Sequence, residues 1–264
     1  MERELQIDTT FPLDSAPQSD AVIEEVPNDP KRKHEKATET FKYIAEQILE
    51  LSIPEQTINN WKSVTASIKV IDKQLDHIVD KETRQAYSAR LAEFLTDDSV
   101  GFPDDPATQD AMARVRDVSS ELSENQRTFF FDSLKIILKI TEKLKNEESV
   151  KKFADLTRLE GQLTAKLYTS FLPEEYQHGE KYAKLILVFT RLGRVANNLD
   201  SFIDLPEDHK QKQTKIEPTI LNRAVLLGTA VSDAAAVLKN VKLSGRLIKQ
   251  ILLRVAYDYQ NQEK

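Results

Sequence analysis

Two short segments of the sequence carry aspartates at steps of four residues. The six aspartates are Asp72, Asp76 and Asp80 in the first segment and Asp200, Asp204 and Asp208 in the second. On a helix this spacing lines the carboxylates up along one face, where like charges repel each other. Mg²⁺ prefers oxygen ligands, and two facing stripes of this kind could hold two or three ions against the oxygens of a substrate phosphate. The spacing therefore predicts a magnesium site between the two segments.

Acidic residues at this spacing are also common on solvated helix faces, and either segment alone fits that interpretation. Both segments, however, end helices that are predominantly apolar, with Leu75 in the first and Phe202 in the second beside the acids. Titratable groups at the rim of a buried space are more often functional than structural. The pair favours a shared site, with a helical adaptor whose acids face solvent as the alternative.

The elements that position these segments are expected to be helices. The 264-residue chain has 6 glycines, 10 prolines and 30% charged residues, which is typical of long helices joined by short loops. We predict an all-α protein with one domain over residues 34–264, after a polar, proline-containing leader at 1–33 that stays flexible. Eight or nine helices would be enough to surround a central cavity.

Apolar periodicity places these helices along the chain. They are expected at about 35–51, 58–80, 81–95, 108–122, after a capping box at Ser123–Gln126, and at about 148–171, 180–205, 219–239 and 243–260. The first aspartate segment then lies on the last turns of the helix at 58–80. The second begins near the end of the helix at 180–205, which Pro206 is expected to stop.

Composition excludes several classes of function. The net charge of -6 disfavours binding to nucleic acid, which needs a basic face. With no cysteine and four histidines that lack paired spacing, a thiolate or zinc site is not expected. No stretch is judged apolar enough to span a bilayer and the N-terminus lacks the apolar core of a signal peptide, so a cytoplasmic location is expected. Peripheral association with a membrane through an apolar substrate stays open.

The segments LDHIVD (Leu75 to Asp80) and NNLDSFIDLPED (Asn197 to Asp208) resemble the squalene/phytoene synthase superfamily, and more closely the bacterial class I large-terpene synthases. The first DxxxD motif of that family matches Asp76 and Asp80. The second matches Asp204 and Asp208, with Asp200 before them. The resemblance implies an isoprenoid-synthase fold in which these aspartates hold a magnesium cluster and an allylic prenyl diphosphate is ionised to a carbocation.

Such an enzyme also needs groups that bind the diphosphate and an apolar cavity for the carbocation. The candidates for the diphosphate are Lys73, Asn197, Lys210 and Lys212, and those for the cavity are Phe41, Tyr168, Phe189 and Tyr257. Lysines also crowd ordinary helix ends, and aromatic residues at helical spacing usually fill a core. Lys73 stands where the family usually has an arginine, so the fork that binds diphosphate in a bidentate manner is lost.

The expected function is that of a terpene synthase or prenyltransferase acting on a prenyl diphosphate with Mg²⁺. Two alternatives remain open. One is head-to-head condensation of two prenyl diphosphates, as in squalene and phytoene synthases. The other is a binding or assembly protein that keeps the fold without the chemistry.

Overall fold

The computed structural model describes residues 30–78, 80–95, 97 and 105–240. These residues form eight α-helices and one short 3-10 helix, with no strand among them, which confirms the all-α prediction. The helices are α1 (Pro30–Leu49), α2 (Glu55–His77), α3 (Lys81–Phe94), α4 (Pro106–Ser120), α5 (Glu124–Asn146), α6 (Val150–Thr169), η1 (Glu174–Tyr176), α7 (Gly179–Lys210) and α8 (Ile220–Asn240). The predicted helix at 243–260, with Tyr257, lies outside the described residues.

The first helix begins earlier in the chain than the sequence predicts. Helix α1 already begins at Pro30, inside the predicted leader, whose residues 1–29 lie outside the described part of the chain. Proline is well suited to a first helical position, because its missing N–H would have no partner there. The capping box predicted at Ser123 is present, with the Gln126 side chain accepting from the Ser123 backbone at 2.9 Å.

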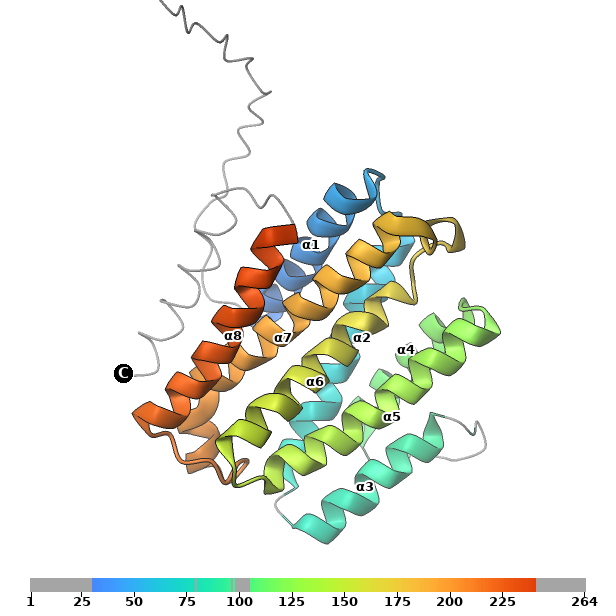
Figure 1. Cartoon of the computed structure of the whole chain (residues 1–264). Coiled ribbons are helices and arrows are strands. Elements are labelled where there is room, and N and C mark those ends of the chain that lie inside the picture. The colour runs from blue at the N-terminus through green and yellow to red at the C-terminus, as the bar shows by residue number, and fades with distance from the viewer. Residues whose placement is uncertain (1–29, 79, 96, 98–104, 241–264) are drawn as a thin grey trace, which may run out of the picture.

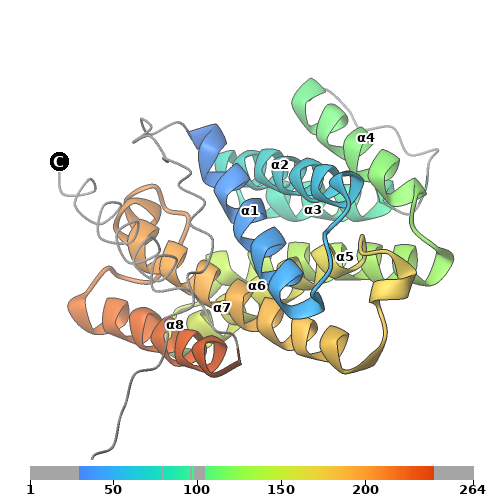
Figure 2. The same cartoon turned by 90° about the horizontal axis from the view of Figure 1, so that it is seen from above.

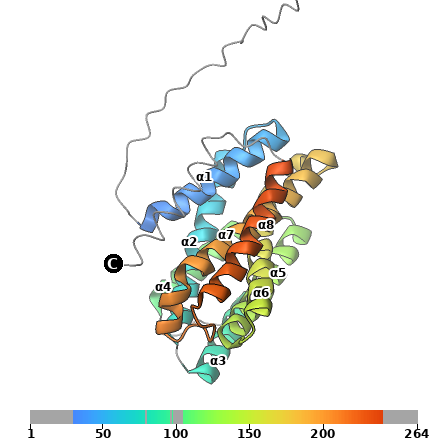
Figure 3. The same ribbon diagram turned by 60° about the vertical axis from the view of Figure 1, so that its left-hand side comes forward.

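The helices are arranged in two layers (Figures 1 and 2). Helices α5, α6 and α7 lie side by side in one layer, with α8 packed across α7 and α6, and α1, α2 and α4 lie in the other layer, with α3 beside α5. The α6–α7 pair lies between α2 on one side and α8 on the other, as Figure 2 shows, and α8 lies in front of this pair in Figure 3. This central pair therefore has two faces, and each face meets a different partner helix.

A pair of glycines sets the spacing of α6 and α7. Gly161 on α6 and Gly193 on α7 lie backbone against backbone, and a Cβ atom on either one would overlap the carbonyl oxygen of the other. Only glycine allows so close an approach of two helices. Side chains just beyond the contact, such as Glu160 and Asn197, can therefore reach across from one helix to the other.

Helix α8 differs from the other helices in its exposed face. Ile220, Leu221, Val231 and Leu238 on this helix are exposed to solvent. Residues Ile220–Lys239 are long and apolar enough to cross a membrane by length and composition alone, so the expectation that no segment reaches that limit is wrong for α8. Asp233, near the middle of the same segment, is completely buried against α6 and α7.

Candidate functional site

The first aspartate stripe is shorter than the sequence predicts. Helix α2 ends at His77, because Ile78 adopts an extended backbone conformation. Asp80 instead caps the N-terminus of α3, where its carboxylate accepts hydrogen bonds from the backbone N–H and the hydroxyl of Thr83, both at 2.7 Å. These bonds, the hydroxyl first, hold the pKa of Asp80 below its usual value. The placement of Asp80 on one helical stripe with Asp72 and Asp76 was therefore wrong.

The second stripe is more regular than predicted. Helix α7 does not stop at Pro206 but continues to Lys210, so Asp200, Asp204 and Asp208 all lie on one helix. Proline removes one backbone hydrogen bond from a helix and usually kinks or ends it. The neighbouring Leu205 is buried in the core, and this packing holds the last turns of α7 in place.

The aspartates of α2 and α7 lie in the same region of the molecule. Burial raises the pKa of Asp72 from 3.8 to about 6, and the charges of Asp76 on its own helix and Asp200 on α7 raise it further. Asp72 keeps contact with solvent, so we infer that it lies in a recess with protein around it.

Asp208 shows the same effect from the other helix. Burial raises its pKa to about 7, followed by the charge of Asp204 and then by those of Asp76, Asp200 and Asp72. The carboxylates of the two helices therefore repel one another across the gap between α2 and α7. Shared repulsion of this kind is typical of sites that bind cations or transfer protons.

Two further charged groups join these aspartates. Lys145 on α5 forms an ion pair with Asp76, with its Nζ atom 2.5 Å from Oδ1. Glu160 on α6 accepts hydrogen bonds from the hydroxyl of Thr141 at 2.7 Å and from the amide of Asn197 at 3.2 Å. Burial raises the pKa of Glu160 to about 7, and the charge of Asp72 contributes. We call the set Asp72, Asp76, Glu160, Asp200, Asp204 and Asp208 the acidic cluster.

Sequence reasoning missed both Lys145 and Glu160, although each leaves a signal. Lys145 lies on the same helical stripe as Leu138 and Thr141, and Glu160 lies one heptad after the buried Phe153. A charged residue on an otherwise apolar stripe is rarely buried without a partner. That irregularity could have marked both residues as members of a buried polar site.

Most of the residues predicted to bind diphosphate form no observed bond with the acidic cluster. Lys73 and Lys212 are exposed, and the exposed Lys210 forms an ion pair with Glu207 at 3.5 Å. Only Asn197 contacts a member of the cluster. Among the described residues, the ion pair observed with the acidic cluster comes instead from Lys145, which was not predicted.

The apolar space beside the cluster is small. A cavity of about 50 Å³ lies between α2, α3, α4 and α5, and Asp72 is the one charged residue among its lining side chains. A larger open groove of about 620 Å³ between α3, α5 and α6 contains none of the predicted site residues. Sites for small molecules usually measure about 300 to 1,000 Å³, so the small cavity would have to expand to admit a ligand of that size.

The predicted cavity aromatics pack against one another in the core. The ring centroid of Phe41 lies 4.8 Å from that of Tyr168 and 4.7 Å from that of Phe189. Trp61 completes the group and donates its indole N–H to the Tyr168 carbonyl at 2.7 Å. Phe41, Tyr168 and Phe189 do not line the cavity beside Asp72.

The donor atoms of the acidic cluster are of the type that Mg²⁺ prefers. In the described part of the chain, no three acidic, histidine or cysteine side chains are gathered closely enough to hold an ion as they stand. Comparison of the chain with protein families, with curated proteins and with solved structures finds no match. The acidic cluster must therefore be interpreted from its own chemistry.

Proposed function

We propose that the acidic cluster binds Mg²⁺ and that the protein uses it to bind and ionise an allylic prenyl diphosphate, as a terpene synthase or prenyltransferase. The observation that carries this proposal is that carboxylates on α2 and α7 lie close enough to repel one another across the gap between the helices, which adds to burial in raising the pKa of Asp72 and of Asp208. A divalent cation between the two helices would relieve that repulsion. Its carboxylate ligands would be Asp76, Asp200, Asp204 and Asp208, with Asp72 beside them.

When bound, Mg²⁺ supplies positive charge to the diphosphate as its C–O bond breaks and the electron pair leaves with it. Lys145 is already held beside Asp76 and offers further N–H donors to the same leaving group. Asn197 holds Glu160 in place by its hydrogen bond. The allylic carbocation would then need a dry apolar space, which the side chains beside Asp72 offer after expansion.

Diphosphate release tests the proposal. The protein is incubated with farnesyl, geranylgeranyl and longer prenyl diphosphates, with and without Mg²⁺, and free diphosphate is measured. We expect Mg²⁺-dependent release that falls at least about 100-fold on Asp76→Asn or Asp204→Asn, a typical loss when an electrostatic contact to the leaving group is removed. The matched control is Asp132→Asn, an exposed acid on α5, which should leave the rate unchanged. Absence of release from every substrate would overturn the enzymatic proposal.

A second candidate is a diphosphate-binding or assembly protein without catalysis. Two observations favour it: the apolar cavity measures only about 50 Å³, and Asp80 is engaged in capping α3. A non-hydrolysable diphosphate analogue with Mg²⁺ should then raise the melting temperature while no substrate turns over. The enzyme predicts both the shift and turnover, whereas a solvent-facing acidic surface predicts neither.

A further inference from the structure

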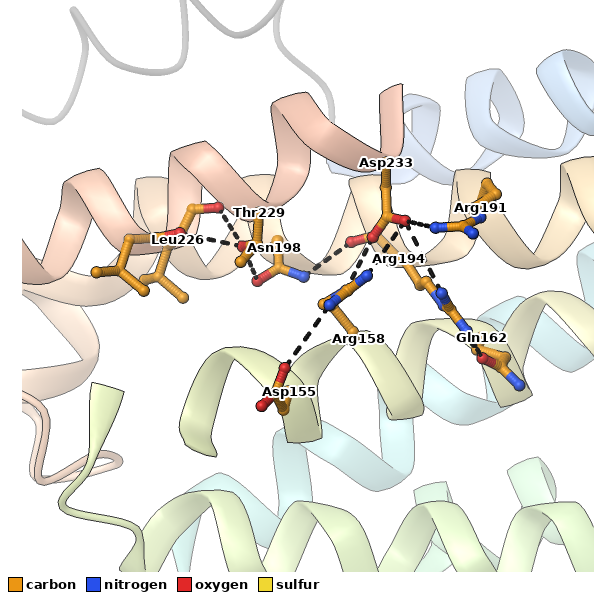
Figure 4. A network of polar contacts seen from close by, with 10 residues as sticks. Asp155, Arg158, Gln162, Arg191, Arg194, Asn198, Leu226, Thr229 and Asp233 are labelled. Atoms are coloured by element: carbon orange, nitrogen blue, oxygen red, sulfur yellow. Dashed lines mark hydrogen bonds and ion pairs between the residues drawn. The ribbon is translucent and has the colours of Figure 1, made fainter. Parts of the chain in front are cut away.

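The opposite face of the α6–α7 pair carries a second charged cluster of reversed sign. Figure 4 shows Asp233 of α8 pointing between Arg158 of α6 and Arg191 and Arg194 of α7. Arg158 donates to Asp233 through Nε at 2.9 Å, Arg191 donates through a short bond to the same carboxylate, and Arg194 lies 3.8 Å away. We call Arg158, Arg191 and Arg194 the arginine cluster.

The arginine cluster has more positive charge than its own carboxylate neutralises. Three guanidinium groups, which remain protonated in proteins, share the one buried carboxylate of Asp233. The next acid, Asp155, is largely exposed and lies 3.7 Å from Arg158. Burial and then the charges of Arg191 and Arg158 lower the pKa of Arg194, although the charge of Asp233 acts in the opposite direction. At least one positive charge at this place lacks a close anion among the described residues.

The guanidinium groups remain accessible from outside. Between 23% and 33% of each arginine side chain is exposed, whereas Asp233 is completely buried beneath them. Arg191 contacts the other described side chains through one of its terminal nitrogens alone, which leaves N–H donors on its outer edge. Gln162 fixes the direction of Arg194 by accepting from its Nε at 3.1 Å. The three arginine side chains are thus held in place by the buried Asp233, and N–H donors remain on their solvent-exposed side.

We propose that the arginine cluster binds an anion of the phosphate class, such as inorganic phosphate, diphosphate or a phosphate monoester. Arginine matches the geometry of phosphate oxygens with paired N–H donors, and clustered arginines are the usual means of recognising that group. The buried carboxylate of Asp233 holds the fork-shaped groups together so that they need little reordering when the anion arrives. Binding at this site requires no metal, so it is independent of the function proposed for the acidic cluster.

Calorimetric titration with inorganic phosphate and with diphosphate tests this proposal. The full-length protein is used at constant ionic strength with EDTA, which removes Mg²⁺ from any magnesium site. We expect saturable binding whose dissociation constant rises about tenfold on Arg191→Gln, since one charge-assisted contact is lost. The matched control is Lys184→Gln, an exposed cation on the same helix, which should leave binding unchanged.

Absence of saturable binding, or an equal loss in both variants, would overturn the proposal. If Arg191→Gln does not fold, Asp233→Asn gives an independent test. The asparagine keeps an acceptor oxygen that can hold the arginines in place but removes the competing negative charge, so phosphate binding should tighten. Unchanged or weaker phosphate binding by folded Asp233→Asn would also contradict it. A final arm uses phosphatidylcholine vesicles with and without phosphatidic acid. Arginine-dependent capture by the acidic vesicles identifies a lipid phosphate as the source, and its absence together with phosphate binding identifies a soluble one.

Discussion

The two faces of the α6–α7 pair carry opposite charge, but each combines a set of like charges with one charge of the opposite sign. Toward α2, five aspartates and Glu160 share one region with Lys145, which forms an ion pair with Asp76. Toward α8, three arginines surround one buried anion, Asp233. In each case a single charge forms an ion pair with one or more members of a larger set of the opposite sign.

The difference between the two faces lies in how the excess charge is carried. Carboxylates can take up protons, and burial first and then the neighbouring carboxylates raise the pKa values of Asp72, Asp208 and Glu160, so protonation can relieve the excess negative charge on the acidic face. Guanidinium groups cannot release protons near neutral pH. The acidic face should therefore respond to pH and to cations, whereas the arginine face should respond to anions alone.

The largest effect is expected at the buried carboxylate of the arginine face. Asp233→Ala leaves three guanidinium groups without their shared partner and should lower the free energy of unfolding by about 4 kcal/mol. Urea denaturation measures the change. Asp155→Ala, which removes an exposed acid from the same arginine cluster, should alter stability by less than about 1 kcal/mol. Similar losses in the two variants would mean that burial of Asp233 does not hold the arginines together.

A somewhat smaller effect should follow from separating the two central helices. Gly193→Ala forces a Cβ atom into the backbone of Gly161 and should destabilise the protein by about 3 kcal/mol. The control is Gly228→Ala on α8, where an added Cβ meets no neighbour and should stabilise the helix by up to about 1 kcal/mol. Thermal unfolding of both variants gives the comparison, and a neutral Gly193→Ala would contradict the observed backbone contact.

The acidic face should make stability depend on pH. The pKa of Glu160 is 4.5 in a model peptide and about 7 in the folded protein, so the folded state holds this proton more tightly. Its contribution is therefore complete below about pH 4.5 and is lost as the pH rises through about 7. We expect the melting temperature to fall over this interval and Glu160→Gln to recover on the order of 2 kcal/mol at the alkaline end.

Magnesium should oppose the same loss at alkaline pH, when the carboxylates are ionised, and have little effect at acidic pH. A melting temperature that is independent of pH in Glu160→Gln and wild type alike would show that the acidic cluster is not repulsive. The arginine face provides the internal reference, because Arg191→Gln should leave the pH profile unchanged.

The smallest effect is expected at Asp80. Asp80→Ala removes the N-cap of α3 and should cost about 1 kcal/mol, whereas Asp80→Asn keeps a good capping residue and should cost much less. Chemical denaturation distinguishes the two variants. If Asp80→Asn also abolishes the stabilisation by Mg²⁺, then Asp80 belongs functionally with Asp76, as the sequence motif implies.

The described helices were predictable from apolar periodicity, but some of their ends were not, and the two ends beside the aspartates show why. No glycine or proline marks the break at Ile78, so the regular spacing of Asp72, Asp76 and Asp80 indicated a continuous helix. Pro206 gave the opposite error, because its local preference to end a helix is outweighed by the burial of Leu205. Tertiary packing outweighs the local signal at Pro206, whereas the break at Ile78 is followed by the local N-cap of Asp80 on Thr83, which the regular spacing of the aspartates obscured.

Partners that are distant in sequence were also beyond prediction. The approach of the α2 and α7 aspartates follows from their regular spacing once two helices are assumed to face each other. Nothing comparable links Arg158 to Asp233, since the two residues lie on different helices and neither belongs to a repeated pattern. The acidic face was therefore anticipated in outline, and the arginine face became visible only with the fold.

The glycine contact between α6 and α7 also bears on the order of folding. These two helices are consecutive in the chain and joined by the short connection at residues 170–178, so their association closes a small loop and loses little chain entropy. Asp76 of α2 and Asp233 of α8 come from outside this hairpin. The hairpin is expected to form early and to display both sets of charges to water before either partner helix arrives. The charge of Asp233 would then attract α8 to the arginines, whereas α2 brings Asp72 and Asp76 to an acidic face and would have to dock against repulsion.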